Sequence, residues 1–145
     1  MNEYEWYEAR GIDSDMRACF EHNYVNMDIK DIKKVVAVWE GENDGDNWRW
    51  IAQINQYHHD DYVFIEAGCD YTGWDCQSWV HIQIYGDFDT CIPVAMSYLM
   101  SQNRNDVVDS LLNQLSVGKN KTWRENMDKL LNINSSNIID IPKKK

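Results

Sequence analysis

Thiols, carboxylates and aromatic rings are concentrated in one stretch of twelve residues, GCDYTGWDCQSW, at positions 68–79. A thiolate can bind zinc, or it can act as a nucleophile when a neighbouring imidazole takes its proton. Tyrosine and tryptophan contribute much of the binding energy at protein interfaces, so the same stretch could also contact a partner. Because binding and catalytic residues are often carried by loops, this stretch is the first candidate for a functional site.

Metal binding is one chemistry that the stretch suggests. Cys69 and Cys76 are candidate zinc ligands, with help from His58, His59 or His81. Structural zinc sites, however, usually hold cysteines about two to four residues apart, whereas six residues separate these two. We therefore expect no metal and no other cofactor. A small-molecule or metal-binding domain that uses the Cys69–Cys76 loop, and that could be an enzyme, remains the alternative to the function predicted below.

Nucleophilic catalysis is a second chemistry, with Cys76 activated by a histidine from a neighbouring strand. The chain has no histidine after His81 to complete such a pair. It also contains no phosphate-binding glycine loop, no His-Glu-x-x-His and no Gly-x-Ser-x-Gly motif. The sequence therefore does not predict an enzyme.

A structural role is the third hypothesis for the stretch. In it the two cysteines are small buried residues, and Asp70 and Asp75 accept hydrogen bonds from loop amides. Gly73 supplies a positive φ. Of the two rings, we expect Trp74 to be the more buried and Tyr71 the more exposed.

The outer edge of the loop would remain free to contact a partner under this third hypothesis. A second acidic turn, whose spacing lacks the distal glutamate of a calcium loop, offers further carboxylates. The predicted partner-binding residues are Tyr71, Thr72, Trp74, Asp75, Gln77, Glu42, Asp44 and Asp46.

The string CDYTGWDCQS resembles a motif shared by small bacterial and phage-associated proteins of uncharacterised function. The resemblance continues upstream through Val38-Trp39-Glu40-Gly41 and Asp46-Asn47-Trp48. It covers the central strands and neither the N-terminal nor the C-terminal helices. It implies that the loop is a fixed feature of the fold, and it implies no activity.

Four segments with the pattern of β-strands must position this loop: residues 34–40, 48–55, 62–67 and 79–85. The second alternates cleanly: one face carries Trp48, Trp50, Ala52 and Ile54, and the other carries Arg49, Ile51, Gln53 and Asn55. An Asp-Gly pair lies in the first connection, as is typical of hairpins. Because all connections are short, the pattern predicts a four-stranded antiparallel meander.

Helical periodicity flanks the strands on both sides. Residues 14–27 predict an N-terminal helix with Ser14 as its N-cap. Apolar residues at helical spacing over 92–100 and 108–115 predict two C-terminal helices, the first with Pro93 in its first turn. A Thr122–Glu125 capping box predicts a third helix. We therefore predict one α+β domain over residues 1–132 and a flexible polar and basic tail over 133–145.

Charge is unevenly distributed along the 145 residues, whose formal net charge is −10. Residues 1–90 hold 19 acids and 6 bases, whereas residues 91–145 hold 5 acids and 8 bases. An acidic body repels the phosphates of nucleic acids and favours basic protein surfaces, so we expect no nucleic-acid partner. Solubility alone is the other explanation for this acidity.

No signal peptide and no apolar run long enough to span a bilayer is visible, so we expect a cytoplasmic protein with reduced cysteines and no membrane partner. The hypothesis that these observations favour is a small acidic protein-binding module, an inhibitor that occludes a partner with a basic surface. A phage inhibitor of a host defence protein and an immunity-type antidote to a toxin both fit. A purely structural subunit is the third possibility.

Overall fold

The chain divides into two compact units, Met1–Cys91 and Ile92–Lys145. A computed structural model describes residues 1–56 and 59–132, so the predicted tail over 133–145 lies outside the described residues. The single domain over residues 1–132 stays a prediction. None of the helices within the described ranges is long and apolar enough to cross a membrane.

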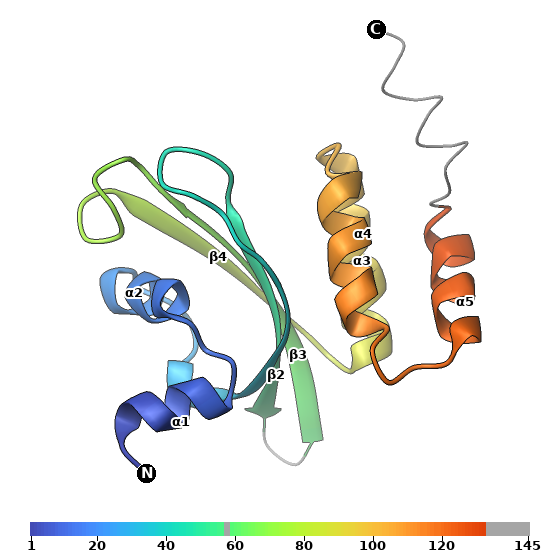
Figure 1. The fold of residues 1–145 in the computed structure, drawn as a ribbon, viewed down its shortest axis with the longest axis horizontal. Helices are drawn as coiled ribbons and strands as arrows, with labels where there is room; N and C mark the ends of the chain where they lie inside the picture. The colour runs from blue at the N-terminus through green and yellow to red at the C-terminus, as the bar shows by residue number, and fades with distance from the viewer. Residues whose placement is uncertain (57–58, 133–145) are drawn as a thin grey trace, which may run out of the picture. The chain divides into compact units, whose positions relative to one another are not determined.

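The first unit contains a four-stranded antiparallel sheet with the strand order β1-β2-β3-β4 (Figure 1). Its strands are β1 (Ile32–Trp39), β2 (Trp48–Gln56), β3 (His59–Cys69) and β4 (Ser78–Tyr85). The predicted meander and the α+β class are confirmed. In a meander, successive connections alternate between the two ends of the sheet. The loops over residues 40–47 and 70–77 therefore lie at the same end, as Figure 1 shows.

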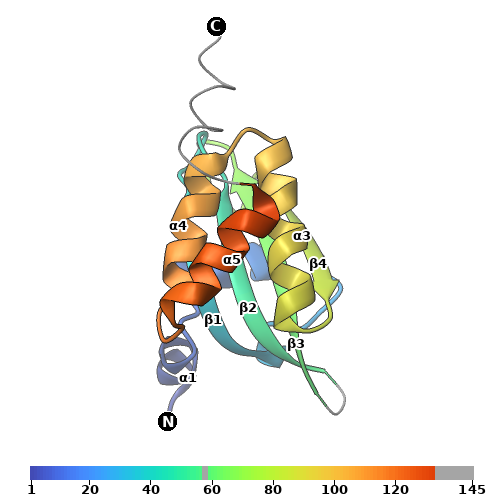
Figure 2. The same ribbon diagram turned by 90° about the vertical axis from the view of Figure 1, so that its right-hand side faces the viewer.

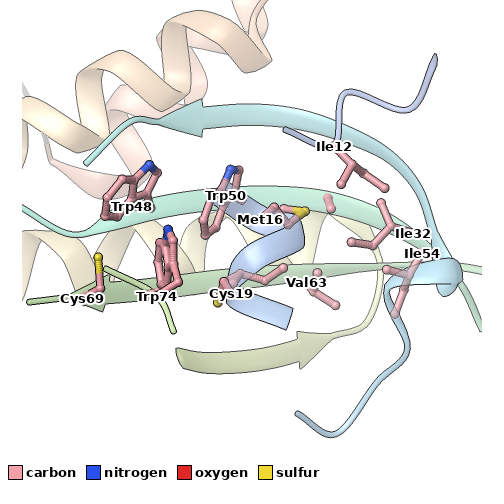
Figure 3. Close-up of a cluster of buried hydrophobic side chains, with 13 residues drawn as sticks. Ile12, Met16, Cys19, Ile32, Trp48, Trp50, Ile54, Val63, Cys69 and Trp74 are labelled. Atoms are coloured by element: carbon pink, nitrogen blue, oxygen red, sulfur yellow. The ribbon is translucent and has the colours of Figure 1, made fainter. Parts of the chain in front are cut away.

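A cluster of buried hydrophobic side chains lies on one face of the sheet (Figure 3), and Ile51 and Phe64 are buried on the other face. Trp48 and Trp50 of β2 are opposite Ala67 and Ile65 of β3, and all four side chains are buried. Burying the apolar area of such rings provides the main drive for folding. The alternation read from the sequence of β2 therefore correctly identified the residues of this cluster, but Ile51 on the opposite face is buried as well.

Helix α2 (Ser14–His22) contributes Met16 and Cys19 to the same core. The helix is shorter than the predicted 14–27 because the side-chain amide of Asn23 donates to the Cys19 carbonyl oxygen and to Ser78 Oγ. Its N-cap is Asp13, whose side chain accepts from the Met16 amide, and not the predicted Ser14.

A further helix, α1 (Glu3–Ala9), precedes α2 and was not predicted, since it carries no buried residue to mark an apolar stripe. A capping box between Asn2 and Glu5 stabilises its first turn. A short 3₁₀ turn, η1 (Ile29–Asp31), then leads into β1.

Helices make up the described part of the second unit: α3 (Phe88–Ser101), which starts just before the unit boundary, α4 (Asn105–Leu115) and α5 (Lys121–Leu131). Helices α3 and α4 form an antiparallel pair, and α5 lies across it (Figure 2). Arg124 of α5 forms an ion pair of 2.6 Å with Asp109 of α4. The three predicted C-terminal helices are thus present.

Two predicted details of these helices are wrong. Helix α3 begins at Phe88, so Pro93 lies beyond the first turn. Helix α5 is capped by Asn120, whose side chain accepts from the Trp123 amide, and not by a Thr122–Glu125 capping box.

Candidate protein-binding surface

The two acidic loops predicted to contact a partner are joined to each other. The backbone amide of Asp44 donates to the carbonyl oxygen of Cys69 at 2.9 Å. The Cys69 thiol donates to Oδ1 of Asn43 at 3.2 Å. The end of β3 therefore connects the 40–47 loop to the 70–77 loop, and residues about thirty positions apart in sequence form one surface. We call those predicted partner-binding residues of these loops that are exposed the two-loop surface: Glu42, Asp44, Tyr71, Thr72, Asp75 and Gln77.

The 40–47 loop is a tight turn closed at its base. The Glu42 amide donates to the carbonyl oxygen of Asp46, and the Gly45 amide donates to that of Glu42. A Cβ atom at Gly41 would lie 2.4 Å from the Asp46 carbonyl oxygen, so only glycine allows this close approach. The turn exposes the carboxylates of Glu42 and Asp44, neither of which has a hydrogen bond or ion pair within the described residues.

The 70–77 loop is held by its own backbone. The Asp70 amide donates to the Gln77 carbonyl oxygen at 3.0 Å, which closes the loop. The Asp70 side chain accepts from the Thr72 amide, as predicted, and Gly73 has the predicted positive φ, at 103°. Asp75 differs from the prediction: its side chain makes no hydrogen bond within the described residues, and it is exposed.

Trp74 anchors the 70–77 loop to the core. Its indole ring is 9% exposed, and its centroid lies 4.9 Å from that of Trp48 (Figure 3). Its Nε1–H donates to Oδ1 of Asp15 in α2 at 3.1 Å. Tyr71, by contrast, is 76% exposed. The expected division between the two rings is confirmed, and the structure places Trp74 beneath the two-loop surface and not on it.

Asp46 is also placed differently from the other predicted carboxylates. Its Oδ2 accepts from Trp39 Nε1 at 2.9 Å, and its Oδ1 accepts from Arg49 Nη1 at 2.8 Å. Arg49 is buried and also donates to Glu66 at 2.9 Å. Both carboxylate oxygens of Asp46 thus serve a hydrogen-bond network of the sheet, and we exclude this residue from the two-loop surface.

The two thiols of the loop differ in their surroundings. Cys69 is buried, and its burial raises the pKa of the thiol, to which the nearby carboxylates of Asp15 and Asp70 add. Cys76 is exposed and makes no hydrogen bond to a histidine within the described residues. Because the thiolate is the reactive form, the raised pKa of Cys69 disfavours this thiol as a nucleophile.

The histidines proposed as metal ligands are not brought to these thiols by any described contact. Nε2 of His81 lies 3.1 Å from Nε2 of Gln83. His58 and the side chain of His59 lie outside the described residues. Among the residues that the structure does describe, no group of three or more His, Cys, Asp and Glu side chains could hold a metal ion.

Two residues of this region were missed in the sequence. Asn43, between the two predicted acids, joins the loops through Cys69, and no sequence pattern indicates this contact. Trp79 is the register partner of Gly68 and is 44% exposed. Its place on the face opposite Val80 and Ile82 could have been inferred from the alternation along β4.

Comparison with known proteins yields no match: no family model, no curated protein and no solved structure is similar to this chain.

Proposed function

We propose that the protein binds another protein through the two-loop surface and occludes a basic surface of that partner. One observation carries the proposal. An exposed tyrosine, Tyr71, shares a rigidly supported surface with three carboxylates that have no partner within the described residues, Glu42, Asp44 and Asp75.

The support beneath the surface favours binding. The Cys69 contacts hold the two loops together, and Trp74 anchors one of them to α2. A surface that is already ordered loses little conformational entropy when it binds. Tyrosine suits such a surface because it offers a large contact area and has few rotatable bonds.

The charge of the two-loop surface indicates the chemistry of the partner. Exposed carboxylates without intramolecular partners attract lysine and arginine side chains and accelerate association with a basic protein. The net charge of −10 acts in the same direction at longer range. We therefore propose an inhibitor that works in the cytoplasm, either against a host defence protein or as an antidote to a basic toxin.

Site-specific crosslinking tests the proposal. A photoreactive phenylalanine analogue is placed at Tyr71, or at Tyr24 as the matched control, since Tyr24 is a tyrosine of the same unit that is 98% exposed. After illumination in the native host, we expect the Tyr71 probe to capture a protein with a basic surface that the Tyr24 probe does not capture. The same protein captured equally by both probes would contradict the proposal.

Affinity for the captured protein tests the residue roles. Tyr71→Ala should weaken binding by about 2 kcal/mol, as for an aromatic hot spot, and Tyr24→Ala should leave it unchanged. The double variant Glu42→Gln/Asp75→Asn should slow association, and the matched pair Glu8→Gln/Glu21→Gln should slow it less. An association rate that does not change with salt concentration would contradict the electrostatic part of the proposal.

A further inference from the structure

Residues of α1, of α2 and of the segment that follows α2 line an open cleft in the first unit. The cleft shares no residue with the two-loop surface. It has a volume of about 790 Å³ and adjoins a smaller cavity of about 400 Å³. Tyr7 of α1 and Ser14 and Arg17 of α2 line both cavities. A space of this size accommodates a small organic molecule.

Arg17 is the unusual group of the cleft. Its guanidinium carbon lies 5.3 Å from the ring centroid of Tyr7 and 5.6 Å from that of Tyr4. Its Nε–H donates to the Asp13 carbonyl oxygen at 3.4 Å. It forms no ion pair within the described part of the chain, and its guanidinium faces the rings of Tyr4 and Tyr7.

None of the carboxylates that line the two cavities forms an ion pair with Arg17 within the described residues. Glu3 lies 3.5 Å from Nζ of Lys30, and Asp28 accepts from the Lys30 amide at 2.9 Å. The two oxygens of Asp13 accept from the Met16 amide and from the indole of Trp50. Glu21, which also lines the larger cavity, lies 3.6 Å from Nε2 of His22, and Glu8 lines the smaller cavity. Arg17 is therefore a cation of the cleft with which no carboxylate of the described residues pairs, although the chain as a whole is acidic.

The remaining wall of the cleft is apolar and well supported. Phe20, Met27 and Ile29 line it and pack against the buried core of the sheet. They are partly exposed to the cavity, so a ligand that covered them would remove apolar surface from water.

We propose that this cleft binds a monoanionic carboxylate that carries an apolar group. The carboxylate accepts from both terminal nitrogens of Arg17, the geometry that guanidinium and carboxylate prefer. The apolar group lies against Met27 and Ile29. A dianion such as a phosphate monoester is disfavoured, because Glu3, Glu21 and Asp28 also line the cavity and would repel it. The carboxylate is that of a free organic acid or the C-terminus of a peptide.

An NMR titration of the intact protein with 3-phenylpropanoate tests whether the cleft requires a negatively charged ligand. The signals followed are the backbone amides and the Arg17 Nε–H. We expect saturable shifts at Arg17 and at residues of the cleft, and none at Tyr71. The neutral isostere 3-phenylpropanamide should bind about tenfold more weakly or worse, since it loses the charge-assisted hydrogen bonds. Equal binding of the amide, tighter binding of phenyl phosphate, or no saturable shift would overturn the proposal.

A pair of arginine variants tests the residue. Arg17→Lys keeps the charge and loses the bidentate geometry, so affinity for the carboxylate should fall by about tenfold. Arg10→Lys is the matched control, because the Arg10 guanidinium lies over Trp6 at 3.9 Å and does not line either cavity. Thermal melts establish that both variants are folded. An equal loss in both variants, or no loss in Arg17→Lys, would overturn the assignment.

Peptides distinguish the two sources of the carboxylate. The tripeptide Ala-Ala-Phe is compared with its C-terminal amide and with 3-phenylpropanoate. Tighter binding of the free-ended peptide than of the small acid assigns the cleft to peptide C-termini, and the reverse order assigns it to small organic acids. Failure of both carboxylates to bind would overturn the proposal and would leave the two-loop surface unaffected.

Discussion

The indole of Trp74 donates a hydrogen bond of 3.1 Å to the carboxylate of Asp15, two residues that are 59 positions apart. This contact joins the 70–77 loop to α2, and the ring of Trp74 packs on Trp48 of the sheet. Three parts of the first unit therefore meet at one side chain. The exposed side of the 70–77 loop therefore lies directly above Trp74, a residue of the core.

The two rings of the loop should respond differently to truncation. Trp74→Ala should lower the free energy of unfolding by about 3 kcal/mol or more, because it leaves a cavity and removes a hydrogen bond. Tyr71→Ala should change it by less than about 0.5 kcal/mol, as is usual at an exposed position. Chemical denaturation measures both. A large loss of stability in Tyr71→Ala would show that this ring supports the fold.

The Asp15–Trp74 hydrogen bond should appear as a coupling energy. In a double-mutant cycle with Asp15→Ala and Trp74→Phe, we expect about 1–2 kcal/mol of coupling, because the acceptor is a carboxylate. The control cycle pairs Asp15→Ala with Trp79→Phe, which changes a half-exposed tryptophan with no described contact to Asp15. That cycle should be additive, and coupling of similar size in both cycles would argue against a direct bond.

A methyl group at Gly41 should disrupt the 40–47 loop. Its Cβ would lie 2.4–2.7 Å from backbone atoms of residues 46–48, which cannot move without opening the turn. We expect Gly41→Ala to cost about 2 kcal/mol or more of stability. Gly86→Ala is the matched control, because a Cβ there meets nothing within 4 Å. Its stability should be unchanged or raised by up to about 1 kcal/mol.

Two buried thiols should make stability depend on alkaline pH. Burial raises the pKa of the Cys19 thiol to about 12, with smaller contributions from Cys69 and Asp13. Burial also raises the pKa of Cys91 to about 12, and the ordinary value for both thiols is 9.0. Above pH 9 the unfolded chain loses these protons while the folded chain keeps them. Stability from this source is therefore complete below pH 9 and falls as the pH rises toward 12.

Denaturation curves between pH 8 and pH 11 measure this effect. Tyrosines and lysines titrate in the same range, so the informative quantity is the difference between the wild type and Cys91→Ala. The variant should lose stability less steeply as the pH rises. Parallel pH profiles for the two proteins would contradict the raised pKa of Cys91.

Local sequence signals determined much of the architecture. Period-two alternation in β2 identified Trp48, Trp50, Ala52 and Ile54 as core residues, and all four are buried. Short connections predicted the meander, since an antiparallel pair needs only a short turn. Helix α1 was not predicted because none of its residues is fully buried, although Trp6 and Tyr7 pack against the core and a capping box closes its first turn.

The roles of individual polar side chains, by contrast, were decided by the tertiary structure. Glu42, Asp44 and Asp46 look equivalent in sequence, yet Asp46 alone among them accepts from Trp39 and Arg49, which strand pairing brings to it. Arg17 has no sequence feature that marks it, and its place in a cleft between two tyrosine rings results from how α1 packs beside α2. The reason is physical: backbone periodicity depends on near neighbours in the chain, whereas the partner of a charge depends on which distant residues the fold brings within a few ångströms of it.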